Sequence, residues 1–213
     1  MYQFDKSLIT FSVKDRRMVT ILITLATVFL TCAMSKASPN LPPGNAVQQW
    51  NTIAENTVVG SGAFQAEGFL YMAYVSVAVY DAVVSIEGGY EPYGAATTAD
   101  SGASTEAAVV EAAYRTLINY FPSQATTLDF FYTEALALIP DDAKKTAGLA
   151  VGLAAATTII NLRAGDGRLT PIAVTSLLST LPPGPGVWRL TPFAFAAPQT
   201  PWVANVRPFI LQN

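Results

Sequence analysis

The residue types that most often carry catalysis are scarce in this chain. Its 213 residues include no histidine, which is the usual proton shuttle near neutral pH and the commonest metal ligand. The single cysteine, Cys32, lies in a segment that we expect to be removed. Most hydrolytic and metal chemistry is therefore excluded before any motif is considered.

Two polar pairs stand out against apolar surroundings. Asp81 follows Tyr80 in a stretch that is otherwise apolar, and burying an unpaired carboxylate is costly. Asp81 therefore either helps to shape a site, or pairs with an arginine or a neighbouring backbone; we favour the pairing. Trp188 with Arg189 could stack on a ligand, but we expect the pair to anchor an extended segment.

The remaining charged groups indicate no active site. The turn Gly165-Asp-Gly-Arg168 lacks the lysine and the preceding strand of a phosphate-binding loop, and it predicts a helix stop and a tight turn. Lys144 and Lys145 are expected on a solvated face. Carboxylates at helix starts or exposed positions do not face each other as glycosidase chemistry needs; they are Glu106, Glu111, Asp141 and Asp142. We assign no catalytic, cofactor-binding or metal-binding residue.

The elements that must position these groups are helical up to about residue 165. Apolar spacing, N-cap residues, prolines and glycines predict the helices. Ser104 is expected to cap the third helix, with Glu106 in its first turn, and Asp141 the fifth. The helices are expected over residues 46–59, 63–86, 105–120, 122–139 and 142–164.

Two of these helices are expected to be deeply buried. The second shows a wide apolar surface, and Glu67 and Asp81 within it favour a core helix over a membrane span. Residues 148–160 of the fifth are almost all small or apolar, so they should pack against neighbours at close distance. The apolar face singled out on the second helix comprises Phe69, Met72, Ala73, Ser76, Val77 and Tyr80.

The chain changes character after Gly165. Eight of the 14 prolines lie between Pro171 and Pro208, interleaved with tryptophan and phenylalanine, so the segment cannot be a regular helix. We predict an all-α fold: a bundle of about five helices in residues 38–165, followed by a proline-rich extended strap in residues 166–213. Apolar surface exposed around the last helix and the strap would mark a partner site or an aggregation liability.

The N-terminus predicts export. Lys14, Arg16 and Arg17 precede the apolar run Met18–Leu30, and small residues follow up to Ala37. This pattern indicates a signal peptide in residues 1–37, with Met18 as a possible start, and a secreted or periplasmic protein. An uncleaved anchor is the alternative. Lipidation of Cys32 is disfavoured because Thr31, not a smaller residue, precedes it.

Without residues 1–37 the chain is acidic. It keeps seven basic and 13 acidic residues, a net charge of −6. The basic residues form neither a run nor a stripe. Nucleic-acid binding is therefore excluded, because it needs clustered positive charge opposite the phosphates.

Four ordered segments carry a resemblance to a known family. They are Val79–Tyr93, which contains Tyr80-Asp-Ala82; Leu162-Arg-Ala-Gly-Asp-Gly167; Pro182–Pro192, which contains Trp188-Arg-Leu190; and Val206-Arg-Pro-Phe209. In this order and spacing the chain resembles, from Ala46 to Leu211, the N-terminal helical half of vanadium-dependent haloperoxidase-like proteins. These belong to the type 2 phosphatidic acid phosphatase and haloperoxidase superfamily.

The resemblance implies an all-helical fold and, in the intact family, a pocket for vanadate or phosphate. That pocket uses Lys-x6-Arg-Pro, Ser-Gly-His and Arg-x5-His motifs, in which lysine and arginine neutralise the oxyanion. None is complete here: Thr200 stands where Arg207-Pro208 would need a lysine, and Ala63 follows Ser61-Gly62. Ser76 also stands where relatives often have a histidine.

The resemblance therefore predicts the scaffold half of such a protein, truncated before the catalytic half. We expect it to be catalytically inactive as this chain and to hold no cofactor, although the intact family holds vanadate. Its partner would be the missing catalytic half, which a separate gene could encode, or further copies of itself. The alternative is a non-enzymatic secreted helical binding module, so the sequence leaves open whether the chain serves an enzyme.

Overall fold

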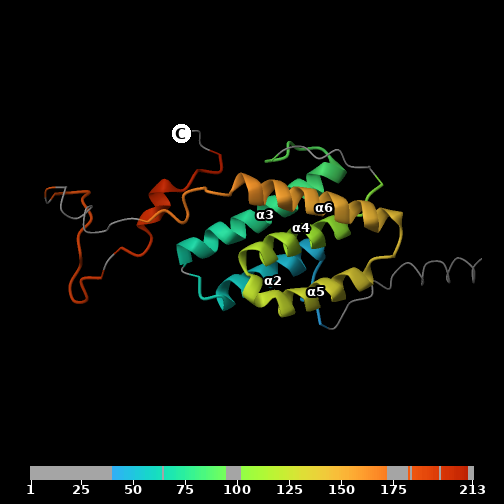
Figure 1. Ribbon diagram of the computed structural model, residues 1–213, viewed down its shortest axis with the longest axis horizontal. Coiled ribbons are helices and arrows are strands. Elements are labelled where there is room, and N and C mark those ends of the chain that lie inside the picture. Colours follow the sequence, from blue (N-terminus) through green and yellow to red (C-terminus); the bar gives the residue numbers. More distant parts are fainter. Residues whose placement is uncertain are drawn as a thin grey trace, which may run out of the picture. The chain divides into compact units, whose positions relative to one another are not determined.

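Within the residues that the structure describes, five α-helices and two short 3-10 helices form the regular structure (Figure 1). The computed structural model describes residues 40–63, 65–94, 102–171, 182, 184–196 and 198–210, and within these there is no strand. The expected signal segment and Cys32 lie outside the described residues. The prediction of an all-α fold with about five helices is confirmed. The helices are α2 (Ala46–Gly60), α3 (Gln65–Glu87), α4 (Thr105–Tyr120), η1 (Pro122–Gln124), α5 (Ala125–Leu138), α6 (Ala143–Leu162) and η2 (Pro201–Asn205).

Side-chain caps define three helix starts. Asn45 and Gln48 form a reciprocal capping box at α2, and Ser104 accepts a hydrogen bond from the backbone of Ala107 at α4, as predicted. The prediction for α6 was one residue out at its start, because Asp142 rather than Asp141 is its N-cap. It was two residues out at its end, because the helix stops at Leu162 and turns through Gly165 at φ +62°.

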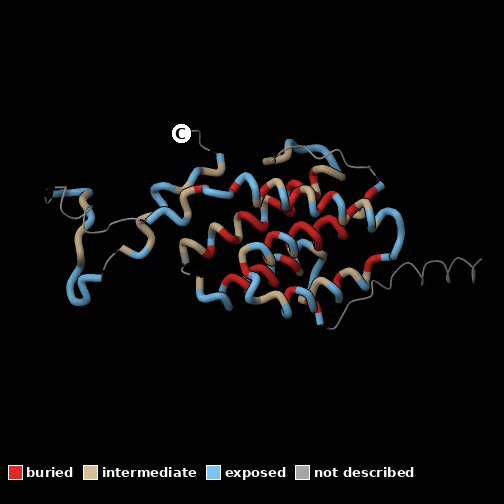
Figure 2. Tube along the Cα trace, viewed as in Figure 1, coloured by how far each residue is buried: buried red, intermediate tan, exposed pale blue. Residues whose placement is uncertain are grey.

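Helix α4 is the centre of the bundle and contacts all four other α-helices (Figure 1). Its buried face is built from small side chains, with Ala107, Ala108, Ala112 and Ala113 fully buried. Figure 2 shows the buried residues along the facing sides of the helices. Small side chains allow the neighbouring helices to approach the α4 backbone closely.

The closest approach is between α4 and α6. A Cβ atom added at Gly148 would lie 2.2 Å from the carbonyl oxygen of Ser104, and one at Gly152 would lie 2.4 Å from that of Ala108. No side chain fits at these separations. The prediction that this part of α6 packs at close distance is confirmed.

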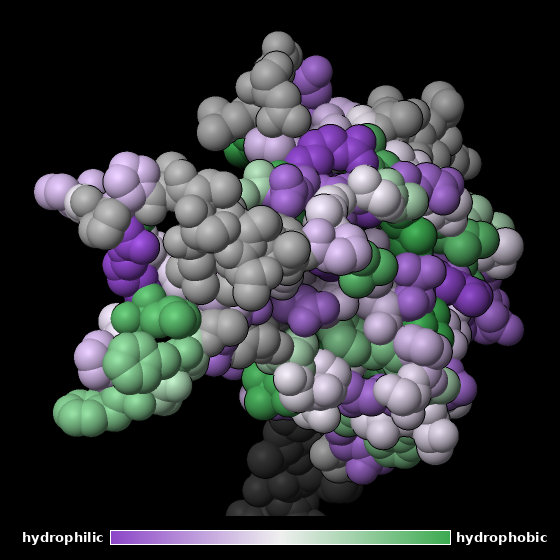
Figure 3. Space-filling model, turned by 60° about the vertical axis from the view of Figure 1, so that its left-hand side comes forward, coloured by the Kyte–Doolittle hydropathy of each residue, from purple (hydrophilic) through white to green (hydrophobic). Residues whose placement is uncertain are grey.

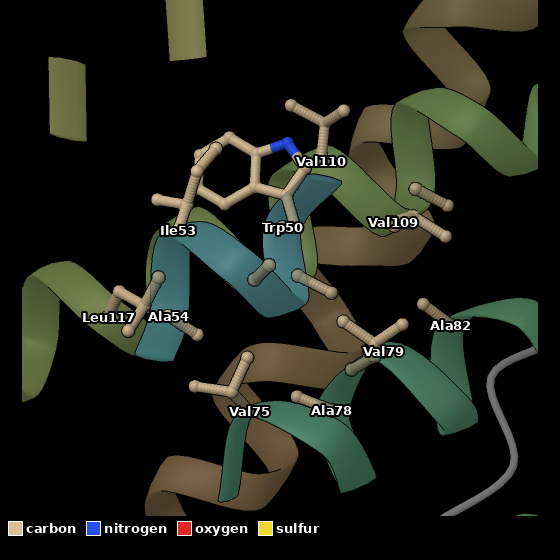
Figure 4. Packing of buried hydrophobic residues seen from close by; sticks show 14 of the residues in the cluster. Trp50, Ile53, Ala54, Val75, Ala78, Val79, Ala82, Val109, Val110 and Leu117 are labelled. Carbon is tan, nitrogen blue, oxygen red and sulfur yellow. The ribbon is translucent and has the colours of Figure 1, made fainter. Parts of the chain in front are cut away.

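The hydrophobic core contains residues of all five α-helices. Trp50 and Ile53 of α2, Ala78 and Val79 of α3 and Leu117 of α4 belong to it, and Figure 4 shows the indole of Trp50 beside Val110 of α4. Trp50 is fully buried, and its indole contacts the Tyr114 ring edge-on at 6.4 Å between centroids. This core orients α3, which contributes Tyr74 and Asp81 to the site described below.

The apolar face that sequence periodicity singled out on α3 proved to be the outer one. Phe69 is 68% exposed and Tyr80 40%, and Ser76 is exposed, whereas Tyr74 and Ala78 on the other side are fully buried. Both sides of α3 are apolar, so periodicity could not select the buried one. By length and composition alone, α3 and α6 would each be able to cross a membrane, but α3 packs its inner side on α2, α4 and α6.

The strap exposes large apolar side chains. Phe193 is 100% exposed, and Trp188, Phe195 and Ile210 are also exposed. Leu153 and Leu162 are exposed on α6, so the predicted apolar surface around the last helix and the strap is confirmed. In Figure 3, where the side carrying the strap comes forward, hydrophobic groups stand out on the surface.

Candidate functional site

The most polar buried spot is an ion pair just after α6. Arg163 is 1% exposed and Asp166 4%, and their side chains form a salt bridge of 3.2 Å. The hydroxyl of Tyr74, on the inner side of α3, donates a hydrogen bond to the same carboxylate. The backbone N–H of Arg168 donates to the other oxygen of Asp166 at 3.0 Å. Asp166 is thus fully surrounded by donors, as a buried carboxylate requires.

The returning end of the strap closes on this pair. The guanidinium of Arg163 donates to the carbonyl oxygens of Arg207 at 2.7 Å and of Pro208 at 3.4 Å. The backbone N–H of Arg207 donates to the carbonyl oxygen of Asp166 at 2.7 Å, and its guanidinium donates to that of Leu162. The chain therefore leaves the helices at Asp166 and comes back to the same point at Arg207.

Aromatic rings enclose the two arginines. The guanidinium carbon of Arg163 lies 4.2 Å from the centroid of Phe209 and 5.4 Å from that of Tyr74. Arg168 lies between Tyr71 and Tyr120, at 5.3 and 5.2 Å. Cation–π contacts of this kind gain strength when they are removed from water. The Nε atoms of both arginines are buried without a hydrogen-bond partner.

Asp81 holds a loop rather than a ligand. It is 2% exposed, and its two oxygens accept hydrogen bonds from the backbone N–H groups of Tyr93 at 2.7 Å and Gly94 at 2.8 Å. The favoured prediction, pairing with a neighbouring backbone, is confirmed. The ring of Tyr93 in turn contacts Phe209 at 5.9 Å between centroids, which connects this loop to the strap.

Three of the four segments that carry the family resemblance meet in this way. Asp81 and Tyr93 belong to the first, Arg163 and Asp166 to the second, and Arg207 with Phe209 to the fourth. We call this set of residues, together with Tyr74, the clasp. Sequence reasoning took Gly165-Asp-Gly-Arg168 for a helix stop and turn only, and it missed the ion pair and the return of Arg207.

Three buried tyrosines in and beside the clasp keep their protons near neutral pH. Burial, followed by the hydrogen bond to Asp166, raises the pKa of Tyr74 far above its usual value. Burial also raises the pKa of Tyr71 and Tyr120, which enclose Arg168 outside the clasp. Tyrosines that hold their protons this firmly do not act as bases near neutral pH, where a general base needs a pKa near the working pH.

A second polar network, with buried Glu111 at its centre, lies between α4 and α5. Glu111 is 3% exposed and accepts hydrogen bonds from Arg115 at 2.7 Å and from the hydroxyl of Tyr132. The prediction that Glu111 is exposed or at a helix start was wrong, because Tyr132 of α5 reaches it from a neighbouring helix. Tyr132 stacks on Tyr114 at 4.1 Å, and Tyr114 donates to Asp129 at 2.6 Å.

The other charged candidates take local roles. Glu106 lies in the first turn of α4 and Asp141 is exposed, as expected. Lys144 is exposed, but Lys145 was wrongly placed on a solvated face: its Nζ atom donates to the carbonyl oxygen of Leu136 at 2.9 Å at the end of α5. A cation there complements the negative end of the helix dipole.

The expectation that Trp188 and Arg189 anchor the strap stays a prediction. The Trp188 side chain is 49% exposed and Arg189 is half-buried. Arg207 and Phe209 hold the C-terminal end of the strap on the helices. Ser61, in the incomplete Ser-Gly-His match, is the C-cap residue of α2, and Ser76 donates to the carbonyl oxygen of Met72 on the outer side of α3.

The residues described above form neither a metal site nor an oxyanion site. Within the described ranges, no three carboxylate or thiol side chains gather as metal ligands would. Vanadate or phosphate would need unengaged cations, but the Nη atoms of Arg163 already serve Asp166 and two carbonyl groups, and Arg163 is almost fully buried. The clasp does not fit an oxyanion.

No family model, curated protein or solved structure matches this chain. The structure itself shows an all-α bundle whose C-terminal strap is tied to the core by the clasp.

Proposed function

We propose that this chain is the scaffold half of a vanadium-dependent haloperoxidase-like protein and has no catalytic activity of its own. One observation carries the proposal: three of the four segments that resemble the family meet at Phe209, which contacts both Tyr93 and Arg163. Segments that matched the family by chance would not be expected to contact one another, so this contact supports the proposal.

In this proposal the clasp has a structural task. It ties the strap and the loop after α3 to the helices through contacts of Arg163, Asp166 and Asp81. The oxyanion-binding lysine, arginines and histidines of the family would come from a different part of the assembly, because the arginines of the clasp are already engaged. Oxidation of halide or hydrolysis of phosphate esters would then require that second part.

The test is reconstitution. The full chain, affinity-tagged, is used to capture partners from its source, and each partner is sequenced for the Lys-x6-Arg-Pro, Ser-Gly-His and Arg-x5-His motifs. Bromination by peroxide with added vanadate is then measured for the chain, for the partner, and for both. We expect turnover only when a partner with these motifs is present. Robust turnover by this chain alone would refute the proposal.

A second candidate, a non-enzymatic binding module, is favoured by the exposed aromatic side chains of the strap. Capture of partners that lack all three motifs, with no bromination in any combination, would support it over the scaffold.

We also propose that the chain is exported and processed after Ala37. The basic flank, the apolar run and the small residues before Ser38 support this. Mass analysis of the protein recovered outside the cell is expected to give an N-terminus at Ser38. Recovery only of the full chain in the membrane fraction would indicate an uncleaved anchor instead.

A further inference from the structure

Residues 191–196 form the longest uninterrupted run of exposed residues in the described part of the chain. We call residues 190–196 the arm. Among the described residues, the arm makes a single hydrogen bond, from the backbone N–H of Phe195 to the carbonyl oxygen of Thr191 at 3.0 Å. Exposed segments whose backbone is so weakly held are preferred sites of proteolytic cleavage.

Two peptide bonds of the arm follow the kind of side chain that an apolar protease pocket selects. Phe193 precedes Ala194 and Phe195 precedes Ala196, so each aromatic ring lies directly before the bond that would be cut. Proteases of the chymotrypsin type hold the side chain at this position in a hydrophobic slot. Phe193 is 100% exposed and Phe195 59%, so the ring of Phe193 leaves no packed position when it enters such a slot.

Two other exposed phenylalanines lie on backbone that is held by helical hydrogen bonds. Phe69 is 68% exposed and Phe130 48%, but they lie inside α3 and α5. Cleavage at these positions requires the helix to open, and the rate then falls with the small population of the open form. An exposed ring is therefore not sufficient to mark a cleavage site.

The exposed Tyr90 lies in a loop, but this loop is tied to α3. Tyr90 is 78% exposed. The hydroxyl of Tyr80 donates to the backbone carbonyl oxygen of Glu91 at 2.8 Å, and the carboxylate of Asp81 accepts from the backbone N–H of Tyr93 at 2.7 Å. The arm makes no hydrogen bond of this kind to a described helix, so its backbone is easier for a protease to take up.

Cleavage of the arm leaves the bundle its contacts. None of residues 190–196 belongs to the hydrophobic core of the described chain. The residues that hold the strap lie on either side of the arm, with Arg163 and Asp166 before it and Arg207 and Phe209 after it. The helices therefore do not have to open for the arm to be cut.

We propose that the arm is a proteolytic processing site, cut after Phe193 or Phe195 by an endoprotease with an apolar primary pocket while the helices stay folded. The reaction is hydrolysis. The C–N bond breaks, the carbonyl carbon of the phenylalanine takes a hydroxyl from water, and the alanine nitrogen takes the remaining proton. The proposal does not depend on the family resemblance, because it rests on exposure and hydrogen bonding.

The test is limited proteolysis of the full chain, with chymotrypsin as the probe and mass spectrometry to locate the cuts. We expect the first cut within residues 38–213 to follow Phe193 or Phe195. Phe193→Ser with Phe195→Ser should lower the rate of cleavage in the arm about tenfold or more, because the apolar pocket loses the ring that it selects. Phe69→Ser removes a similarly exposed ring from α3 and should leave that rate unchanged. A first cut elsewhere in residues 38–213, or equal rates for the two variants, would overturn the proposal.

Two further measurements show whether the cut is made in the folded protein. Gly152→Ala, which disturbs the contact of α6 with α4, should speed the cuts inside the helices and leave the rate in the arm unchanged, since only the former need unfolding. The helical circular dichroism should be retained after the arm is cut. Faster cleavage of the arm in Gly152→Ala, or a helical signal that is lost with the cut, would contradict the proposal.

Discussion

Arg163 lies over the ring of Phe209, with its guanidinium carbon 4.2 Å from the ring centroid. One residue directly follows α6 and the other lies near the end of the chain, so this contact closes the strap onto the helices. The same arginine is also paired with Asp166. Stability of the fold should therefore be unusually sensitive to this one side chain.

The first prediction concerns that ion pair. Arg163→Met should lower the free energy of unfolding by about 3–5 kcal/mol, because it leaves the buried carboxylate of Asp166 without its cation. Denaturant unfolding measures the change. Asp141→Asn breaks another ion pair, one whose carboxylate is 99% exposed, and should have no measurable effect. Equal effects of the two substitutions would contradict the role given to Arg163.

The second prediction concerns the spacing of α4 and α6. Gly152→Ala should destabilise the protein on the order of 1 kcal/mol or more, because the new methyl group would lie 2.4 Å from the carbonyl oxygen of Ala108 and the cost of overpacking exceeds the gain in helix propensity. Gly60→Ala is the matched control. Its nearest neighbour would be 3.7 Å away, so it should be neutral or stabilising by up to about 1 kcal/mol.

The third prediction concerns Asp81. Asp81→Ala should cost about 1–3 kcal/mol, because two backbone N–H groups lose their acceptor. Hydrogen exchange gives a local readout: the amides of Tyr93 and Gly94 should lose protection in this variant, with a smaller loss in Asp81→Asn, which keeps one acceptor oxygen. Unchanged protection of both amides would show that the loop is held by other contacts.

The fourth prediction concerns alkaline pH. The pKa of Tyr74 and of Tyr132 is raised in the folded protein, chiefly by burial and then by hydrogen bonds to Asp166 and Glu111. Above the ordinary tyrosine pKa of about 10 the unfolded chain loses protons that the folded chain keeps, so stability falls as pH rises through this range. Tyr74→Phe and Tyr132→Phe should each reduce that slope in denaturant titrations. Slopes equal to that of the parent protein would contradict this assignment.

The sequence was sufficient to predict features that depend on neighbouring residues. The cap at Ser104 and the dense packing of Gly148 and Gly152 follow from residue type and local spacing. The buried side of α3 could not be chosen, because apolar residues lie on both of its sides. The core position of Tyr74, and not of Ser76, is set by helices distant in sequence.

The clasp and the Glu111 network were beyond prediction for a related reason. A charged residue in a helix usually faces water, and nothing near Glu111 in the sequence indicates that Tyr132 will cover it. From the sequence, Arg163 and Asp166 indicated only the end of a helix. The partners of Arg163 in the strap, the backbone of Arg207 and the ring of Phe209, are more than 40 residues away in the sequence. Long-range polar partners leave no periodic pattern.

The backbone N–H of Arg207 donates a hydrogen bond of 2.7 Å to the carbonyl oxygen of Asp166. This bond joins the two ends of the segment that leaves the helices and returns to them. Because those ends already touch, a change in the length of the chain between them would not have to move a helix. In chain-entropy terms a doubling of such a loop costs only about 0.6 kcal/mol. The strap is thus a place where an insertion would be compatible with the same bundle, provided that Arg168 keeps its place between Tyr71 and Tyr120.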